Sequence, residues 1–534
     1  MTLIKSVLLG SAAGIVAVAS AQAADLPTHK AAPVAQYVKI CDVGGITGWV
    51  MPGTDTCMKV SGYITAQFTG GNLQNQYNWA GSILSAQAAA TDPFATGRAD
   101  QRILVQGGDT AVGIVNAFTG QPVIGANGTQ IILPNQKNAT FNRNAIGWSV
   151  RANIGFDFAS NTAYGPLIGH MDLNSDVGNG FDPLGGDTYL NTGYLTWAGI
   201  TAGKAQSFYS FVGGGDNWAN FFSPDRKGFN EPILMAYTAS FGGGFSATIS
   251  AESQGSVGGS GGGTNMTGAA GSNPGSITFG GQRWPDVVGA LHVKQGWGEA
   301  QVSGVIHNVN VKDYSYYGDT GCGGVDLLLC NAKETKVGWG VDAGVKFNIP
   351  WYAGDTFLVT GSYTQNAVWY SGLPDGMWGE NGQTNGNGQP MYLADAFFNP
   401  LTNQWSQPRA WSVSALLEHH WTPTFYTDLE GSVGGISWNN MGGGCYLVGF
   451  GCAVGQFGSG ALSKKATSWI VGADLGWNPV TNLNFDLELM YQGTTQERPT
   501  GFIGTVFSNG LFVPGDWKGS SNGFAGRFRI TRYF

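Results

Sequence analysis

Cysteine is the residue type in this chain whose spacing most directly suggests covalent chemistry. If the chain is exported, its six cysteines predict three disulfides between partners close in the sequence: Cys41–Cys57, Cys322–Cys330 and Cys445–Cys452. Metal binding is the alternative. However, no pair has Cys-x-x-Cys spacing and no histidine lies close to any pair. We therefore expect neither a metal site nor a cofactor.

Two adjacent histidines, His419 and His420, offer a different chemistry, that of a general base beside a serine nucleophile. They lie on a predicted strand, so one faces lipid and the other shares a face with Ser412 and Ser414. These serines are too many residues away along the strand to reach an imidazole. No Gly-x-Ser-x-Gly turn is followed by suitable partners either. The sequence therefore argues against an enzyme such as an outer-membrane lipase.

The elements that carry these residues alternate between polar and apolar positions, over segments of about ten residues that are long enough to cross a bilayer. The pattern recurs at 148–158, 337–347, 411–421, 425–430, 469–477 and 483–491, with tryptophans at segment ends, as in an interfacial girdle. A soluble sandwich also alternates, but strands this long with charges on one face favour a water-filled lumen. We predict an all-β fold, a transmembrane antiparallel β-barrel with these residues facing the lumen: Arg151, Asp342, Lys346, Asp428, Glu430, Asp474, Asp486, Glu488, Arg527 and Arg529.

The composition agrees with a membrane barrel. Charged residues make up only 11% of the chain, aromatic residues 12%, and 86 of the 534 residues are glycine. Short turns such as 422–424 alternate with long connections, which we interpret as extracellular loops at 70–145, 253–283, 308–335, 365–408 and 438–466. A soluble repeat-rich β-protein or a lectin would share this composition. The net charge of −8 argues against a nucleic-acid partner.

Both ends of the chain carry signals of export. Lys5, the apolar run 7–21 and the small-x-small pattern 21–23 predict a signal peptide over residues 1–23, followed by one domain over 24–534. The last segment, 524–534, alternates and ends in Phe534. A terminal aromatic strand is what outer-membrane proteins present to their assembly machinery, so we expect that partner and outer-membrane lipid.

The stretches 37–42 and 52–63, with a cysteine in each, resemble the alphaproteobacterial porins typified by the major porins of Brucella and rhizobia. Further similarity lies in Gly243–Ala247, in Trp284–Gly289 and in the terminal Arg527–Phe534. The resemblance implies a barrel of about 16 strands, a homotrimer and a third loop folded into the lumen. This chain is longer than such porins, and the excess falls in the predicted loops.

The segment 206–231 occupies the place of that third loop, between a strand predicted at 194–202 and one starting near Ile233. Gly213–Gly215 would permit an inward bend. Its charges, with three arginines expected on the facing wall, form the predicted pore constriction: Asp216, Asp225, Arg226, Lys227 and Glu231, with Arg151, Arg527 and Arg529. The alternative is an ordinary exposed loop with a self-paired Asp-Arg-Lys turn.

The resemblance and the pattern together predict a water-filled channel in the bacterial outer membrane, which passes small hydrophilic solutes and ions by passive diffusion. More carboxylates than basic groups on the predicted lumen face suggest a mild preference for cations. The alternative is a sugar-selective channel that stacks sugar rings on aromatic side chains of the third loop, namely Tyr209, Trp218, Phe221 and Phe222.

Overall fold

The computed structural model describes residues 39–71, 146–180, 188–211, 231–253, 283–314, 334–372, 404–439, 465–497 and 520–534. It also describes short pieces at 82–83, 105–106, 112–113, 132–133, 277–279, 395, 397–399, 504–506 and 512–514. Internal contacts divide the chain into Met1–Ile40 and Cys41–Phe534. The predicted signal peptide lies outside the described residues, and the barrel lies wholly in the second unit.

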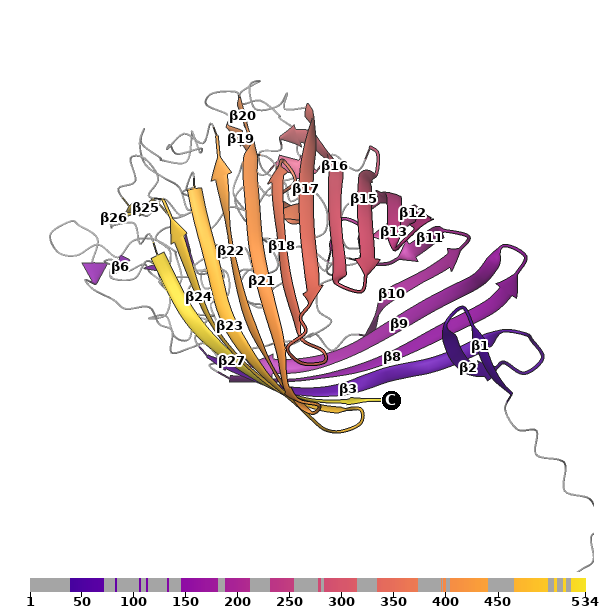
Figure 1. Ribbon diagram of the computed structural model, residues 1–534. Coiled ribbons are helices and arrows are strands. Elements are labelled where there is room, and N and C mark those ends of the chain that lie inside the picture. Colours follow the sequence, from indigo (N-terminus) through magenta and orange to yellow (C-terminus); the bar gives the residue numbers. More distant parts are fainter. Residues whose placement is uncertain are drawn as a thin grey trace, which may run out of the picture. The chain divides into compact units, whose positions relative to one another are not determined.

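Sixteen antiparallel strands form one closed barrel, which confirms the predicted fold (Figure 1). They are β3 (Cys57–Gly71), β8 (Ile146–Thr162), β9 (Gly165–Gly180), β10 (Thr188–Trp197), β11 (Ile200–Lys204), β12 (Ile233–Gly242), β13 (Phe245–Glu252), β15 (Asp286–Gln295), β16 (Gly298–Tyr314), β17 (Glu334–Asn348), β18 (Thr356–Gln365), β21 (Pro408–Thr422), β22 (Phe425–Trp438), β23 (Lys465–Val480), β24 (Leu483–Gln496) and β27 (Ser520–Tyr533).

Each barrel strand pairs with its neighbours in chain order, and the last strand closes on the first. β27 pairs with β3 from Ala525↔Gly71 to Tyr533↔Tyr63. Closure leaves no open edge in the membrane, where an unpaired backbone group would cost several kcal/mol. The short strand β14 (Ile277–Phe279) extends the sheet by pairing with the far end of β16. Among the residues that the structure describes, four two-stranded ribbons lie outside the barrel sheet: β4 (Ser82–Ile83) with β5 (Val105–Gln106), β6 (Val112–Gly113) with β7 (Ile132–Leu133), β19 (Phe397–Asn399) with β20 (Gln404–Ser406), and β25 (Gly504–Val506) with β26 (Phe512–Pro514).

Two strand boundaries differ from the sequence expectation. The segment 194–202, predicted as a single strand, is a hairpin in which β10 turns into β11 at Ala198 and Gly199. Both residues have positive φ, 51° and 86°, and a tight turn needs such angles. In addition, β16 continues to Tyr314, so the loop predicted from residue 308 starts later. A tight turn cannot be recognised from the alternation of polar and apolar residues when the turn residues continue that alternation.

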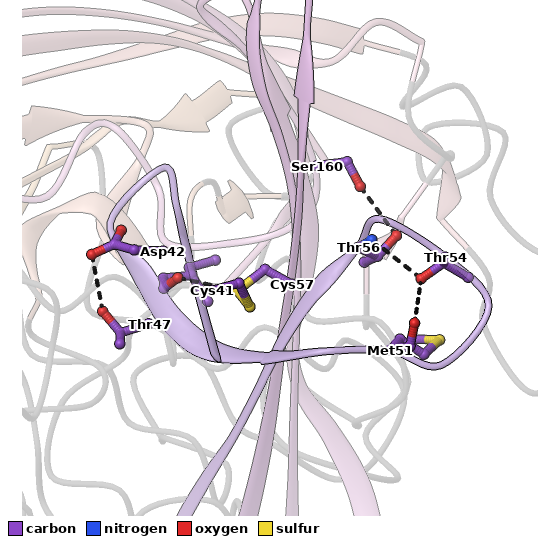
Figure 2. Close-up of a disulfide and its surroundings, with 9 residues drawn as sticks. Cys41, Asp42, Thr47, Met51, Thr54, Thr56, Cys57 and Ser160 are labelled. Atoms are coloured by element: carbon purple, nitrogen blue, oxygen red, sulfur yellow. Dashed lines mark hydrogen bonds between the residues drawn. A yellow bond between two sulfur atoms is a disulfide. The ribbon is translucent and has the colours of Figure 1, made fainter. Parts of the chain in front are cut away.

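A small hairpin covers the start of the first barrel strand. It consists of β1 (Ile40–Val43) and β2 (Ile46–Val50), and β2 pairs with β3 at Val50↔Cys57. The disulfide Cys41–Cys57 ties it down, with Cα atoms 5.8 Å apart, which confirms this predicted bond (Figure 2). The pairing of the chain end with β3 stops at Gly62, whose carbonyl accepts from Phe534 N. The hairpin therefore pairs with the part of β3 that lies beyond the end of β27 and would otherwise be an open edge.

Candidate functional site

The inner face of the barrel is polar and its outer face is apolar. On β8, Trp148 is 61% and Val150 41% exposed, whereas Ser149 between them is 4% exposed. On β27, Phe528 is 41% exposed and Arg527 beside it is 2% exposed. Such an inverted pattern suits a protein whose outside is lipid and whose inside is an aqueous lumen. The predicted lumen-facing acids and arginines all lie on the less exposed face.

Carboxylates from four successive strands form one row across the lumen wall. Register pairs Glu418 with Asp428, Asp428 with Asp474, and Asp474 with Glu488. The row ends at Arg527, which pairs with Glu488. Directly opposite residues on neighbouring strands lie roughly 5 Å apart, so the four carboxylates are closely spaced along the wall. We call these four residues the acidic row.

The three arginines predicted to face the constriction lie on the wall formed by β8 and β27. Arg151 donates Nε and Nη2 to the two oxygens of Asp176, at 2.7 and 2.8 Å. Arg529 donates Nη2 to Gln67 Oε1 at 2.7 Å, and Arg527 is almost fully buried. These hydrogen bonds hold the guanidinium groups of Arg151 and Arg529 in place.

The third loop, the connection from β11 to β12, turns into the barrel directly after β11. Its neck is closed by Ala205 N donating to Pro232 O at 3.2 Å, and by Lys204 Nζ lying 3.7 Å from Glu231 Oε2. Tyr209 then lies against β16 and β18, where its carbonyl accepts from Ser303 Oγ at 2.5 Å. Since β12, β13 and β15 separate β11 from β16 in the sheet, this contact crosses the barrel interior.

Tyr209 also bears on the alternative of a sugar-stacking channel. Its side chain is 0% exposed and its hydroxyl lies 2.7 Å from Ser362 Oγ. The ring is therefore a packing anchor and presents no face to a solute. The other proposed stacking residues, Trp218, Phe221 and Phe222, lie outside the described residues.

The remaining predicted constriction charges, Asp216, Asp225, Arg226 and Lys227, also lie outside the described residues, as do Cys322, Cys330, Cys445 and Cys452. Only Glu231 of the predicted loop charges is described. Its Oε2 lies 3.7 Å from Lys204 Nζ at the loop neck.

The sequence interpretation missed a second inward segment, at the start of the connection from β18 to β21, the sixth loop. The 3-10 helix η4 (Val368–Ser371) is buried in the barrel, with Tyr370 only 2% exposed. Together with Tyr209, Val288 and Val305 it forms an apolar cluster on the inner wall. The signal in the sequence was an apolar and aromatic run, 367–370, directly after a strand in an otherwise polar loop.

At the end of the barrel with the short turns, Asp355 holds the turn between β17 and β18. Its carboxylate accepts from His420 N at 2.8 Å and lies 2.7 Å from His419 Nδ1. Burial opposes ionisation of Asp355, but the backbone bond and the two imidazoles outweigh it and hold the pKa of this carboxyl below its ordinary value. Both histidines thus contact Asp355 at the strand end, while their rings have different neighbours: His419 lies against Trp421, with ring centroids 4.5 Å apart, and His420 against Tyr426, with centroids 5.5 Å apart.

A closed barrel with an apolar outside, a charged inside and a loop folded into the lumen defines a membrane channel. The family model described as Porin subfamily matches residues 25–130 and 130–508. Porin Omp2a of Brucella ovis is 28% identical over 308 residues, which are 57% of this chain and 69% of that protein. Porin Omp2b of Brucella canis is 26% identical over 310 residues, which are 57% of this chain and 65% of that protein, less than two thirds of its length.

Among solved structures, the outer membrane channel DcaP of Acinetobacter baumannii is 12% identical, covers 91% of this chain and 99% of its own, and has a TM-score of 0.48. On the family match, the chain belongs to the Porin subfamily. It is a porin of the bacterial outer membrane, as the sequence resemblance implied.

Proposed function

We propose that this porin passes small hydrophilic solutes and ions by passive diffusion through the part of its lumen lined by β21–β24, β27, β3 and β8. The carrying observation is the charged inner face, with the acidic row on one side and the paired Arg151 on the other. Opposite charges across a narrow aqueous path favour polar solutes over apolar ones. Conductance in planar bilayers, with swelling of liposomes in sugars of increasing size, tests the proposal.

In the same proposal the third loop narrows the path, with Asp216, Asp225, Arg226, Lys227 and Glu231 at the constriction. The inward course of residues 205–211 supports this. Deleting residues 213–227 would then raise conductance and admit larger sugars while the barrel stays folded. If that deletion leaves both quantities unchanged, the constriction lies elsewhere.

A mild cation preference follows from the excess of carboxylates on the lumen wall. The reversal potential under a KCl gradient measures it directly, and a potential that favours chloride would contradict it. Saturable block of the current by one particular sugar would instead favour the selective-channel alternative.

Channel activity, without catalysis, is the role we assign to the whole chain. Ser412 Oγ donates to Ser371 O at 2.5 Å, while His420 Nε2 lies 3.5 Å from Glu418 Oε1, which supports this assignment because the serine and the imidazole engage different partners. Assembly as a homotrimer in outer-membrane lipid, after recognition of Phe534 by the assembly machinery, completes the proposal. Cross-linking of the purified porin and export of a Phe534→Ala variant test these two parts.

A further inference from the structure

Two inward segments meet on one side of the lumen. The third loop contributes Ser207–Tyr209 and the sixth loop contributes Ala367–Ser371, and both lie against the wall of β13, β15, β16 and β18. Tyr209 and Tyr370 are in edge-to-face contact, with ring centroids 4.9 Å apart. The two loops are far apart in the sequence: Ser362, which precedes the sixth loop on β18, already lies 153 residues after Tyr209.

A single serine on β18 joins the two segments. Ser362 Oγ donates to Tyr370 O at 2.7 Å, and its oxygen lies 2.7 Å from the Tyr209 hydroxyl. Since a serine hydroxyl has one hydrogen and that hydrogen goes to Tyr370 O, the Tyr209 hydroxyl is the donor to Ser362. The hydrogen-bond chain therefore runs from the third loop through the wall to the sixth loop.

Glu252, the last residue of β13, holds the third loop. Its Oε2 accepts from Ser207 Oγ at 2.6 Å and its Oε1 accepts from Phe208 N at 3.1 Å. The carboxylate is fully buried. Hydrogen bonds to a buried carboxylate are stronger than those between neutral groups, so Glu252 fixes where the third loop leaves the wall.

Asp286, the first residue of β15, holds the sixth loop in the same way. It accepts from the Tyr370 hydroxyl and lies 2.8 Å from His307 Nδ1. The other nitrogen of His307 lies 3.3 Å from Asp395 Oδ2, and Asp395 Oδ1 accepts from Val368 N at 2.5 Å. His307 thus links the wall carboxylate to two parts of the sixth loop.

The two carboxylates are direct neighbours, because the register of β13 and β15 pairs Glu252 with Asp286. We propose that Glu252 and Asp286 hold the third and sixth loops as one body against the inner wall, so that the sixth loop also sets the size limit of the pore. Both are positioning residues. The inference rests on the proposed channel function, and adds to it a second constricting loop and the coupling between the two.

Single-channel recording of Glu252→Gln and Asp286→Asn tests this. Each variant keeps the side-chain size but loses a charge-assisted bond to its loop, which shifts the loop equilibrium roughly tenfold. We expect the fraction of time in a wider conductance state to rise about tenfold in each variant, and larger sugars to enter. Glu299→Gln is the matched control, since Glu299 is on β16, is partly exposed and lies 3.4 Å from His292 Nε2.

The double variant tests the coupling. If the loops move as one body, the two effects multiply within a single wider state, so Glu252→Gln/Asp286→Asn populates that state roughly 100-fold more than wild type. Independent loops give two separate wider states, each changed by only one of the substitutions, and overturn the proposal. The proposal is also overturned if Asp286→Asn populates the wider conductance state no more than the control Glu299→Gln does. A wild-type protein without conductance would instead refute the channel function itself. Heat-dependent migration of the barrel on gels verifies that each variant is folded.

Discussion

Removing the Cys41–Cys57 disulfide should release the N-terminal hairpin and leave the barrel intact. Two register pairs join β2 to β3, Trp49↔Met58 and Val50↔Cys57, so the backbone pairing between the hairpin and the barrel is short. The bond spans 16 residues. Closing a loop of that length reduces the entropy of the undocked state by an amount worth about 3 kcal/mol. The undocked population should therefore rise roughly 100-fold when the bond is lost.

Amide hydrogen exchange of the folded protein in detergent measures this. In the double variant Cys41→Ser/Cys57→Ala, residues 41–50 should lose protection by roughly 100-fold, while β27 and β8 keep theirs and conductance is unchanged. Thr47→Ala is the control, because it removes only an exposed 3.3 Å hydrogen bond to Asp42 in the same hairpin (Figure 2). Unchanged protection of 41–50, or loss that spreads into the barrel strands, would refute the reasoning.

Three further outcomes are expected. Asp428→Asn/Asp474→Asn should lower the cation permeability about fourfold per carboxylate, the Coulomb effect on a cation of a charge about 5 Å away in water; an unchanged reversal potential would contradict this. Gly344→Ala should displace the third loop and raise current noise, since the added methyl would overlap the ring of Phe211 in that loop. In the control Gly304→Ala the methyl meets only the Gly340 carbonyl oxygen at 3.6 Å, so the current should be unchanged. Folding lowers the pKa of Asp355 from its ordinary value of 3.8, so the charged carboxylate stabilises the fold fully above about pH 3.8. This stabilisation is lost as the pH falls through the lowered pKa of the folded state. The unfolding midpoint of Asp355→Asn should thus lie below that of wild type at pH 7 and converge with it in strong acid.

The strands and their faces were predictable because strand geometry is local. Alternate residues must face opposite sides, so Arg527 and Phe528 could be assigned to lumen and lipid from the sequence alone. The bond Cys41–Cys57 was predictable for the same reason, since its partners are close in the chain. The short turn at Ala198 was not predictable, because its residues continue the alternating pattern of the strands on either side.

The sequence by itself determined a barrel, its polar and apolar faces, and the region that turns inward. Tertiary structure alone decided which distant groups meet: the acidic row across four strands, Tyr209 on Ser362, and Glu252 beside Asp286. The physical reason is that periodicity specifies the direction of each side chain but not the register between strands or the path of a loop. Those depend on closure of the sheet, which brings together residues that the linear chain keeps far apart.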